Sequence, residues 1–200
     1  MRCNQNEPNK SLHPTPHRPR QLNLIENETL FDCLRFTRGR LSFTFGKNKE
    51  NTCNIFMVDD EQTIHSLNDE DQLRLHDQRA VVEQHLAPKF QDNYKTSAGK
   101  LGLLRAIIEG DVFGADETYE WQCCGIVLGD VFVAELGMEW VFVEDSYGRD
   151  PALVVPGTSI LLFPLTMISK RIEQGEDLDV FDLFNGIADM VDTKVAEKRN

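Results

Sequence analysis

Hydrophobic residues recur at helical spacing in three stretches in the middle of the chain. The first is predicted to be a helix over about 68–86, because Ser66 or Asn68 can cap it, acidic residues fill its first turn and a proline follows it. The second stretch predicts a helix from Leu101 to Gly110, and the third predicts a long, largely buried helix over 115–136. A glycine directly after position 136 suits a helix C-terminus.

After the third helix the pattern becomes extended. Residues 138–145 alternate and are rich in aromatic and β-branched side chains, and 152–155 and 158–164 are two further extended runs separated by turn residues. This predicts three antiparallel strands in a meander, followed by helices over 165–176 and 178–198. The predicted fold class is therefore α+β, with helices before and after a small three-stranded antiparallel sheet.

The long central helix carries two glycines one turn apart, Gly125 and Gly129. Each costs about 1 kcal/mol relative to alanine inside a helix, so we expect them to allow close packing against a neighbouring helix or the sheet. Asp130 and Glu135 interrupt the apolar run, which excludes a transmembrane dimer helix.

The five cysteines do not form a disulfide framework or a CxxC motif. Adjacent Cys123 and Cys124 point about 100° apart on a helix, so they cannot readily bridge each other. We interpret them as small apolar helix residues in a reducing cytoplasm, and a reactive thiol is the alternative. The N-terminus lacks the apolar region of a signal peptide, which also favours a cytoplasmic protein.

Charge divides the chain into two unlike parts. The whole chain has a net charge of −12, but residues 1–56 hold nine basic and five acidic residues, net +4, and 57–200 hold twelve basic and twenty-eight acidic, net −16. Three of the prolines before residue 20 block helix and strand pairing, so 1–56 is predicted to be a disordered or poorly structured leader with at most one edge strand around 41–45. Residues 57–200 are predicted to be one α+β domain, and Met57 is a candidate natural start of translation.

The acidic part of the chain limits the partners that it can bind. A net charge of −16 repels nucleic acid and anionic membranes, so neither is expected as a partner, whereas a basic protein partner is favoured. A homo-oligomer is also possible, because a helix face with Phe181 and Phe184 could pair across a two-fold axis.

One string in the leader, PNKSLHPTPHRPR, resembles the translated recombination repeats that flank gene cassettes in bacterial chromosomal integrons. The resemblance implies that the gene is a mobile bacterial cassette. It also implies that this tail carries no selected protein function.

The region from about residue 100 to 195 resembles the bacterial domain of unknown function 3806. Three motifs carry the likeness: G-M-E-W, E-D-x-Y-G-R-D-P and F-P-x-T-M-I-x-K-R. The resemblance implies a bacterial cytoplasmic protein and a domain boundary after residue 56. The family has no assigned activity, so it supplies no catalytic residues.

A dense group of polar residues lies in the first predicted strand of the meander and in the turn that follows it, and two basic residues lie later in the chain. These candidate binding residues are Glu139, Glu144, Asp145, Tyr147, Arg149, Asp150, Lys170 and Arg171. Their carboxylates could hold Mg²⁺ or Ca²⁺, or Glu144 could act as a general base beside Arg149 as an anion clamp. In the structural alternative, Arg149 pairs with Asp145 or Asp150 in a turn and the acids lie on a solvated strand face.

Motifs for nucleotide-dependent phosphoryl transfer, hydride transfer, elbow-type hydrolysis and zinc proteolysis are absent. We therefore assign no catalytic residue, metal site or cofactor. The favoured hypothesis is a non-catalytic acidic interaction module of the inhibitor, immunity or adaptor type. The alternative is a small metal- or ligand-dependent enzyme that uses the hairpin acids around Glu144–Asp150.

Overall fold

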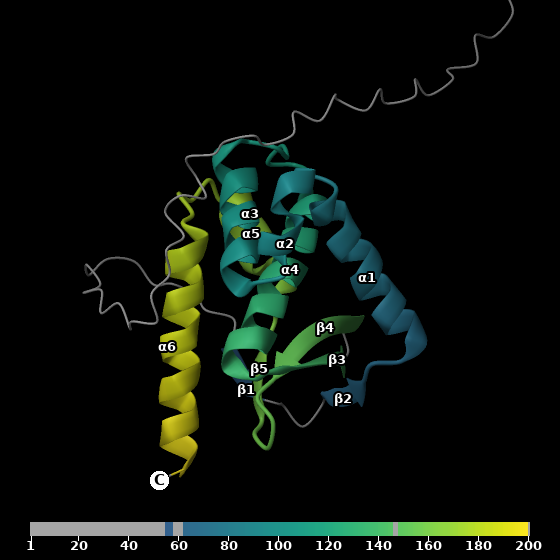
Figure 1. Cartoon of the computed structure of the whole chain (residues 1–200). Helices are drawn as coiled ribbons and strands as arrows, with labels where there is room; N and C mark the ends of the chain where they lie inside the picture. Colours follow the sequence, from purple (N-terminus) through teal and green to yellow (C-terminus); the bar gives the residue numbers. More distant parts are fainter. Residues whose placement is uncertain (1–54, 58–61, 146–147, 200) are drawn as a thin grey trace, which may run out of the picture.

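The computed structural model describes residues 55–57, 62–145 and 148–199 (Figure 1). The leader before residue 55, including the predicted edge strand around 41–45, lies outside the described residues. The helices are α1 (Asp69–Glu83), α2 (Gln91–Tyr94), α3 (Ser97–Glu109), α4 (Thr118–Leu136), α5 (Leu165–Glu173) and α6 (Val180–Arg199), with a 3₁₀ turn at Pro88–Phe90. The strands are β1 (Ile55–Met57), β2 (Thr63–Ser66), β3 (Glu139–Asp145), β4 (Gly148–Val154) and β5 (Ile160–Leu162).

The strands form one antiparallel sheet in the order β1-β5-β4-β3-β2. The predicted α+β class and the meander of β3, β4 and β5 are confirmed, but the sheet has two more strands than the three predicted. The additional strands, β1 and β2, are three and four residues long, too short for a clear alternating pattern. In β2, three of the four side chains are exposed, so the strand lacks the alternation of buried and exposed positions that would identify it in the sequence.

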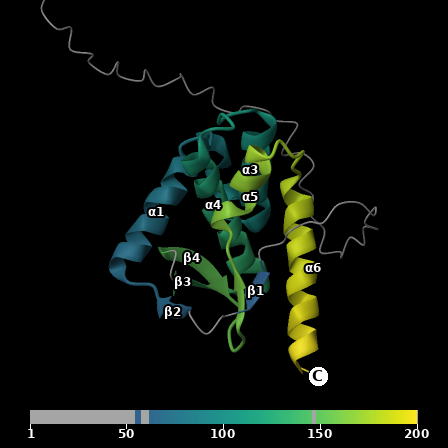
Figure 2. The ribbon, with the colours of Figure 1, turned by 180° about the vertical axis from the view of Figure 1, so that it is seen from behind.

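Helices cover one face of the sheet, with α4 in the centre of the helical layer (Figures 1 and 2). Helix α4 packs against α1, α3 and α5, and its buried side chains share the main core with Leu153 and Leu162 of the sheet. Helices α1 and α6 flank this centre on opposite sides, as the two views show. Within the described ranges, no helix is both long and apolar enough to cross a membrane.

The two glycines of α4 allow two different close approaches. A Cβ atom on Gly125 would lie 2.3 Å from the carbonyl oxygen of Pro164, just before α5, and one on Gly129 would lie 2.4 Å from the ring of Trp140 in β3. Only a residue without a side chain fits at such distances. The expected close packing is confirmed, and α4 meets both a helix terminus and the sheet.

The two cysteines of α4 are buried and unbridged. Burial raises the pKa of the Cys123 thiol to about 11, and burial also raises the pKa of Cys124. Because the thiolate is the reactive form, these environments favour the interpretation as apolar helix residues.

The aromatic residues of α6 contact the body of the same chain. The guanidinium carbon of Arg105 lies 4.3 Å from the ring centroid of Phe181, and Phe184 stacks on Phe132 with 5.4 Å between centroids. Since intrachain contacts use both rings, they give no support to the expected two-fold pairing through this face.

Candidate functional site

The β3–β4 hairpin divides its charged residues between the two faces of the sheet. Glu144 pairs in register with Arg149, whereas Val143 pairs with Asp150. Because successive side chains of a strand alternate, Glu144 and Arg149 share the helix-facing side. The opposite face carries Glu139, Asp145 and Asp150. The predicted site therefore grouped residues that lie on two different faces of the sheet. Tyr147 lies outside the described residues.

Arg149 pairs with Asp71 of α1, and not with Asp145 or Asp150 as the structural alternative predicted. Its Nη2 donates to Asp71 Oδ2 at 2.6 Å, and its Nη1 donates to the other carboxylate oxygen. The reason is the alternation of the strand, which directs Arg149 toward α1 and Asp150 away from it. The Asp71 side chain is 3% exposed and that of Arg149 is 35% exposed.

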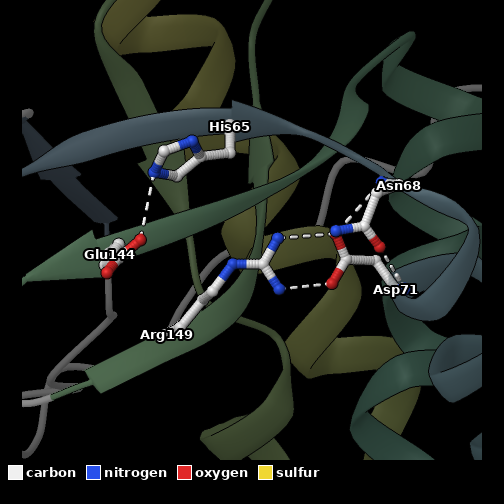
Figure 3. A network of polar contacts seen from close by, with 5 residues as sticks. All are labelled: His65, Asn68, Asp71, Glu144 and Arg149. Atoms are coloured by element: carbon white, nitrogen blue, oxygen red, sulfur yellow. Dashed lines mark hydrogen bonds and ion pairs between the residues drawn. The ribbon is translucent and has the colours of Figure 1, made fainter.

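Asp71 also forms the N-terminal cap of α1 together with Asn68 (Figure 3). Asn68 Oδ1 accepts from the Asp71 backbone N–H at 2.8 Å, and Asp71 Oδ2 accepts from the Asn68 N–H at 3.0 Å. The hydrogen bond from Arg149 lowers the pKa of Asp71, and burial opposes this shift. One carboxylate therefore begins α1 and ties it to β4.

An aromatic ring supports the guanidinium of Arg149. Its central carbon lies 4.3 Å from the centroid of Phe142, and that of Arg74 lies 5.7 Å from the same ring. The hydrogen bond with Asp71 raises the pKa of Arg149. Both the ring and the carboxylate hold this guanidinium in place, which is the role of a structural cation.

A second pair of polar residues lies beside this one (Figure 3). His65 Nε2 of β2 lies 3.2 Å from Glu144 Oε2, and their side chains are 41% and 57% exposed. A carboxylate beside an imidazole is an arrangement used in acid–base catalysis. In the part of the chain that the structure describes, no cluster of three or more His, Cys, Asp and Glu side chains could hold a metal ion.

The two basic residues of α5 lie away from this network. Lys170 is exposed. Arg171 Nη1 donates to the carbonyl of Met167 at 2.6 Å, and its Nε lies 4.0 Å from Glu176 Oε2. The eight predicted residues therefore do not form one site.

Arg171 instead lines a pocket of about 660 Å³ between α3, the segment joining α5 to α6, and α6. We name it the α3–α6 pocket. Its carboxylates are Glu109, Asp111, Glu176, Asp177, Asp179 and Asp182, and its guanidiniums belong to Arg105 and Arg171. Carboxylates outnumber cations by three to one, so the pocket is a concave acidic surface.

Sequence reasoning missed Asp71, His65 and the carboxylates of the pocket. Asp71 has the pattern of an ordinary acid in a first helical turn, and His65 lies in a strand without alternation. The acidic run from Glu176 to Asp182 was the available signal for the pocket.

The family described as Domain of unknown function (DUF3806) matches residues 100–184. The match supports the resemblance to this family that the sequence motifs indicate. The matched segment runs from α3 into the first turn of α6 and contains the hairpin and most of the pocket, whereas Asp71 and His65 precede it.

A crystal structure from Bacteroides thetaiotaomicron VPI-5482 is similar, with a TM-score of 0.53 and 16% sequence identity. The match covers 64% of this chain and 48% of that one, so this chain spans about half the length of its structural relative. At this identity the likeness concerns the fold alone. No protein of curated function matches the sequence.

Proposed function

We propose that this protein is a non-catalytic interaction module whose acidic surface binds a basic region of a partner protein, as an inhibitor, immunity or adaptor protein does. The observation that carries the proposal is the placement of its charges. The described ranges contain 25 acidic residues, and 21 of them are exposed. Such a surface accelerates encounter with basic partners and repels acidic ones.

The basic residues offset this surface charge only in part. Of the ten Lys and Arg residues whose burial is described, five are exposed. The partly buried ones support the fold: Arg79 Nη2 lies 2.6 Å from Asp130 Oδ1, and Arg149 binds Asp71. The described surface is therefore more acidic than the composition alone suggests.

The hairpin alternative has weaker support. Arg149 is bound to Asp71, so it is not available as an anion clamp, and Glu144 lies against His65. The alternating strand also separates Glu144 from the other hairpin acids. We propose a cytoplasmic location, which agrees with the two free, buried cysteines. The origin as an integron cassette stays a prediction from the leader.

Binding from a lysate of the source bacterium tests the proposal. The full chain is immobilised, and captured proteins are compared at about 0.15 M and about 1 M salt, where the Debye length falls from about 8 Å to about 3 Å. We expect a basic protein that is lost at high salt and that binds again when both proteins are purified. Absence of any such partner, or capture that salt does not change, would contradict the proposal.

A thermal-shift screen with Mg²⁺ and Ca²⁺ separates the two functions. The interaction module is expected to show no stabilisation that depends on the hairpin. Stabilisation that disappears in both Glu144→Ala and Arg149→Ala would instead support the hairpin alternative.

A further inference from the structure

The α3–α6 pocket combines an apolar lining with an acidic rim. Ile108 of α3 and Leu183 of α6 are half-buried in its wall, and Met190 is 36% exposed on the same helix. Apolar side chains that remain accessible inside a concave surface are typical of binding sites. The volume of about 660 Å³ lies in the range of ligand pockets, and it can accommodate several side chains of a partner.

Contacts within the chain already use the two guanidiniums of the pocket. Arg105 Nη2 donates to Asp179 Oδ2 at 2.7 Å, and its Nε lies 3.8 Å from Glu109 Oε1. The same guanidinium covers Phe181. Arg171 donates to a backbone carbonyl and faces Glu176. Neither cation is left to neutralise the rest of the rim.

Three rim carboxylates have no such partner. Asp111, Asp177 and Asp182 are exposed, and none of them forms an ion pair with another side chain in the described ranges. Asp179, in contrast, accepts from Arg105 and from the backbone N–H groups of Phe181 and Asp182 at the start of α6. Asp179 therefore stabilises the start of α6, whereas the other three carboxylates are available to bind cations of a partner.

We propose that the α3–α6 pocket is the docking site for a basic amphipathic segment of the partner protein. Lys or Arg side chains of this segment pair with Asp111, Asp177 and Asp182, and its apolar side chains pack on Ile108 and Met190. The inference rests on the proposed function and assigns it a surface. Charge complementarity selects the occupant, because a second copy of this acidic chain would be repelled.

The test uses a synthetic peptide of leucine and arginine placed at the spacing of an amphipathic helix. One control peptide carries glutamate in place of arginine, and another carries serine in place of leucine. Binding to the full chain is measured by titration calorimetry at about 0.15 M salt. We expect the first peptide to bind and each control peptide to bind at least about tenfold more weakly.

Two variants of equal net charge locate the binding. The pocket variant combines Asp111→Asn, Asp177→Asn and Asp182→Asn, and we expect it to bind the leucine–arginine peptide about tenfold more weakly. The control variant combines the exposed positions Asp69→Asn, Asp77→Asn and Asp192→Asn outside the pocket, and we expect less than about a threefold change. Circular dichroism establishes that both variants are folded.

Each remaining outcome overturns a defined part of the inference. Equal weakening by the two variants would overturn the pocket as the docking site and leave the acidic interaction module standing. Undiminished binding of the serine peptide, or of Met190→Gln to the leucine peptide, would overturn the apolar contact. Failure of the unaltered chain to bind either the leucine–arginine peptide or a basic partner from the lysate would overturn the proposed function itself.

Discussion

We call Asp71, Arg149 and Phe142 the hairpin network. It contains the same kinds of charged groups as the α3–α6 pocket, but its charges are paired within the chain and several of those in the pocket are not. In the hairpin network, Arg149 lies between Asp71 and the ring of Phe142. In the pocket, Asp111 and Asp182 have no cationic partner among the described side chains. A paired charge contributes to the fold, whereas an exposed unpaired charge is available to a partner. The difference separates residues that build this domain from residues that can bind.

The largest expected effect on stability comes from a change in α4, the helix that packs against both α1 and α5. Gly125→Ala would place a Cβ atom 2.3 Å from the Pro164 carbonyl, at the entry to α5 and its pocket residue Arg171. We expect the free energy of unfolding to fall by about 3 kcal/mol. Urea denaturation measures it. Ala134→Gly, at an exposed position of the same helix, is the control and should cost about 1 kcal/mol; equal losses would contradict the close packing.

Asp71→Ala should break the hairpin network alone. It removes the partner of Arg149 and one half of the α1 capping box, so we expect the free energy of unfolding to fall by about 2 kcal/mol. Urea denaturation again provides the measurement. Glu70→Ala, an exposed acid in the same turn, should change stability by less than about 0.5 kcal/mol. If Asp71→Ala lowers the free energy of unfolding no more than Glu70→Ala does, Asp71 does not support the fold.

Lowering the pH should reduce the stabilisation that Asp71 contributes to the folded state. Its pKa in the folded state lies below the ordinary value of 3.8, so its stabilisation is present above about pH 4 and is lost as the pH falls through the folded-state pKa. The difference in stability between the unaltered chain and Asp71→Asn should therefore shrink below about pH 4. Urea midpoints measured at several pH values test this expectation. A difference that stays constant with pH, or one that is undiminished in an Arg149→Gln background, would contradict the pairing.

The smallest effect on stability is expected in the pocket. The triple variant at Asp111, Asp177 and Asp182 removes exposed charges without a described partner, so stability should change by less than about 0.5 kcal/mol. At low salt, relief of repulsion among the carboxylates should offset the loss of Asp182 from the first turn of α6. A thermal melt at two salt concentrations measures it. A large loss would show that these residues support the fold, which would remove the contrast with the hairpin network.

Local patterns predicted much of the fold. The capped acidic start and the terminal proline gave a helix over 68–86, close to the observed Asp69–Glu83, and the glycine after position 136 marked the observed end of α4. Strands β1 and β2 were missed because strands of three and four residues depend on their neighbours in the sheet. Their pairing is a long-range property without a periodic signal.

The candidate site was less predictable, because its main contact joins distant parts of the chain. Arg149 and Asp71 are separated by 78 positions, and the packing of α1 beside the sheet decides that they meet. The charged residues between Glu144 and Asp150 were recognised as candidates from their side-chain chemistry. The pattern did not show that the alternating side chains of the two strands divide them between the two faces of the sheet.

Strand β1 covers an edge of the sheet that a chain starting at Met57 would expose. Its three residues pair with Ile160, Leu161 and Leu162 of β5, and a chain beginning at Met57 keeps only the last of them. The backbone of β5 would then become an open edge on an apolar strand, the type of surface through which proteins aggregate. A poorly soluble product from the shorter reading frame would therefore reflect the loss of Ile55 and Phe56, and intact-mass measurement of the native protein would identify the start that the cell uses.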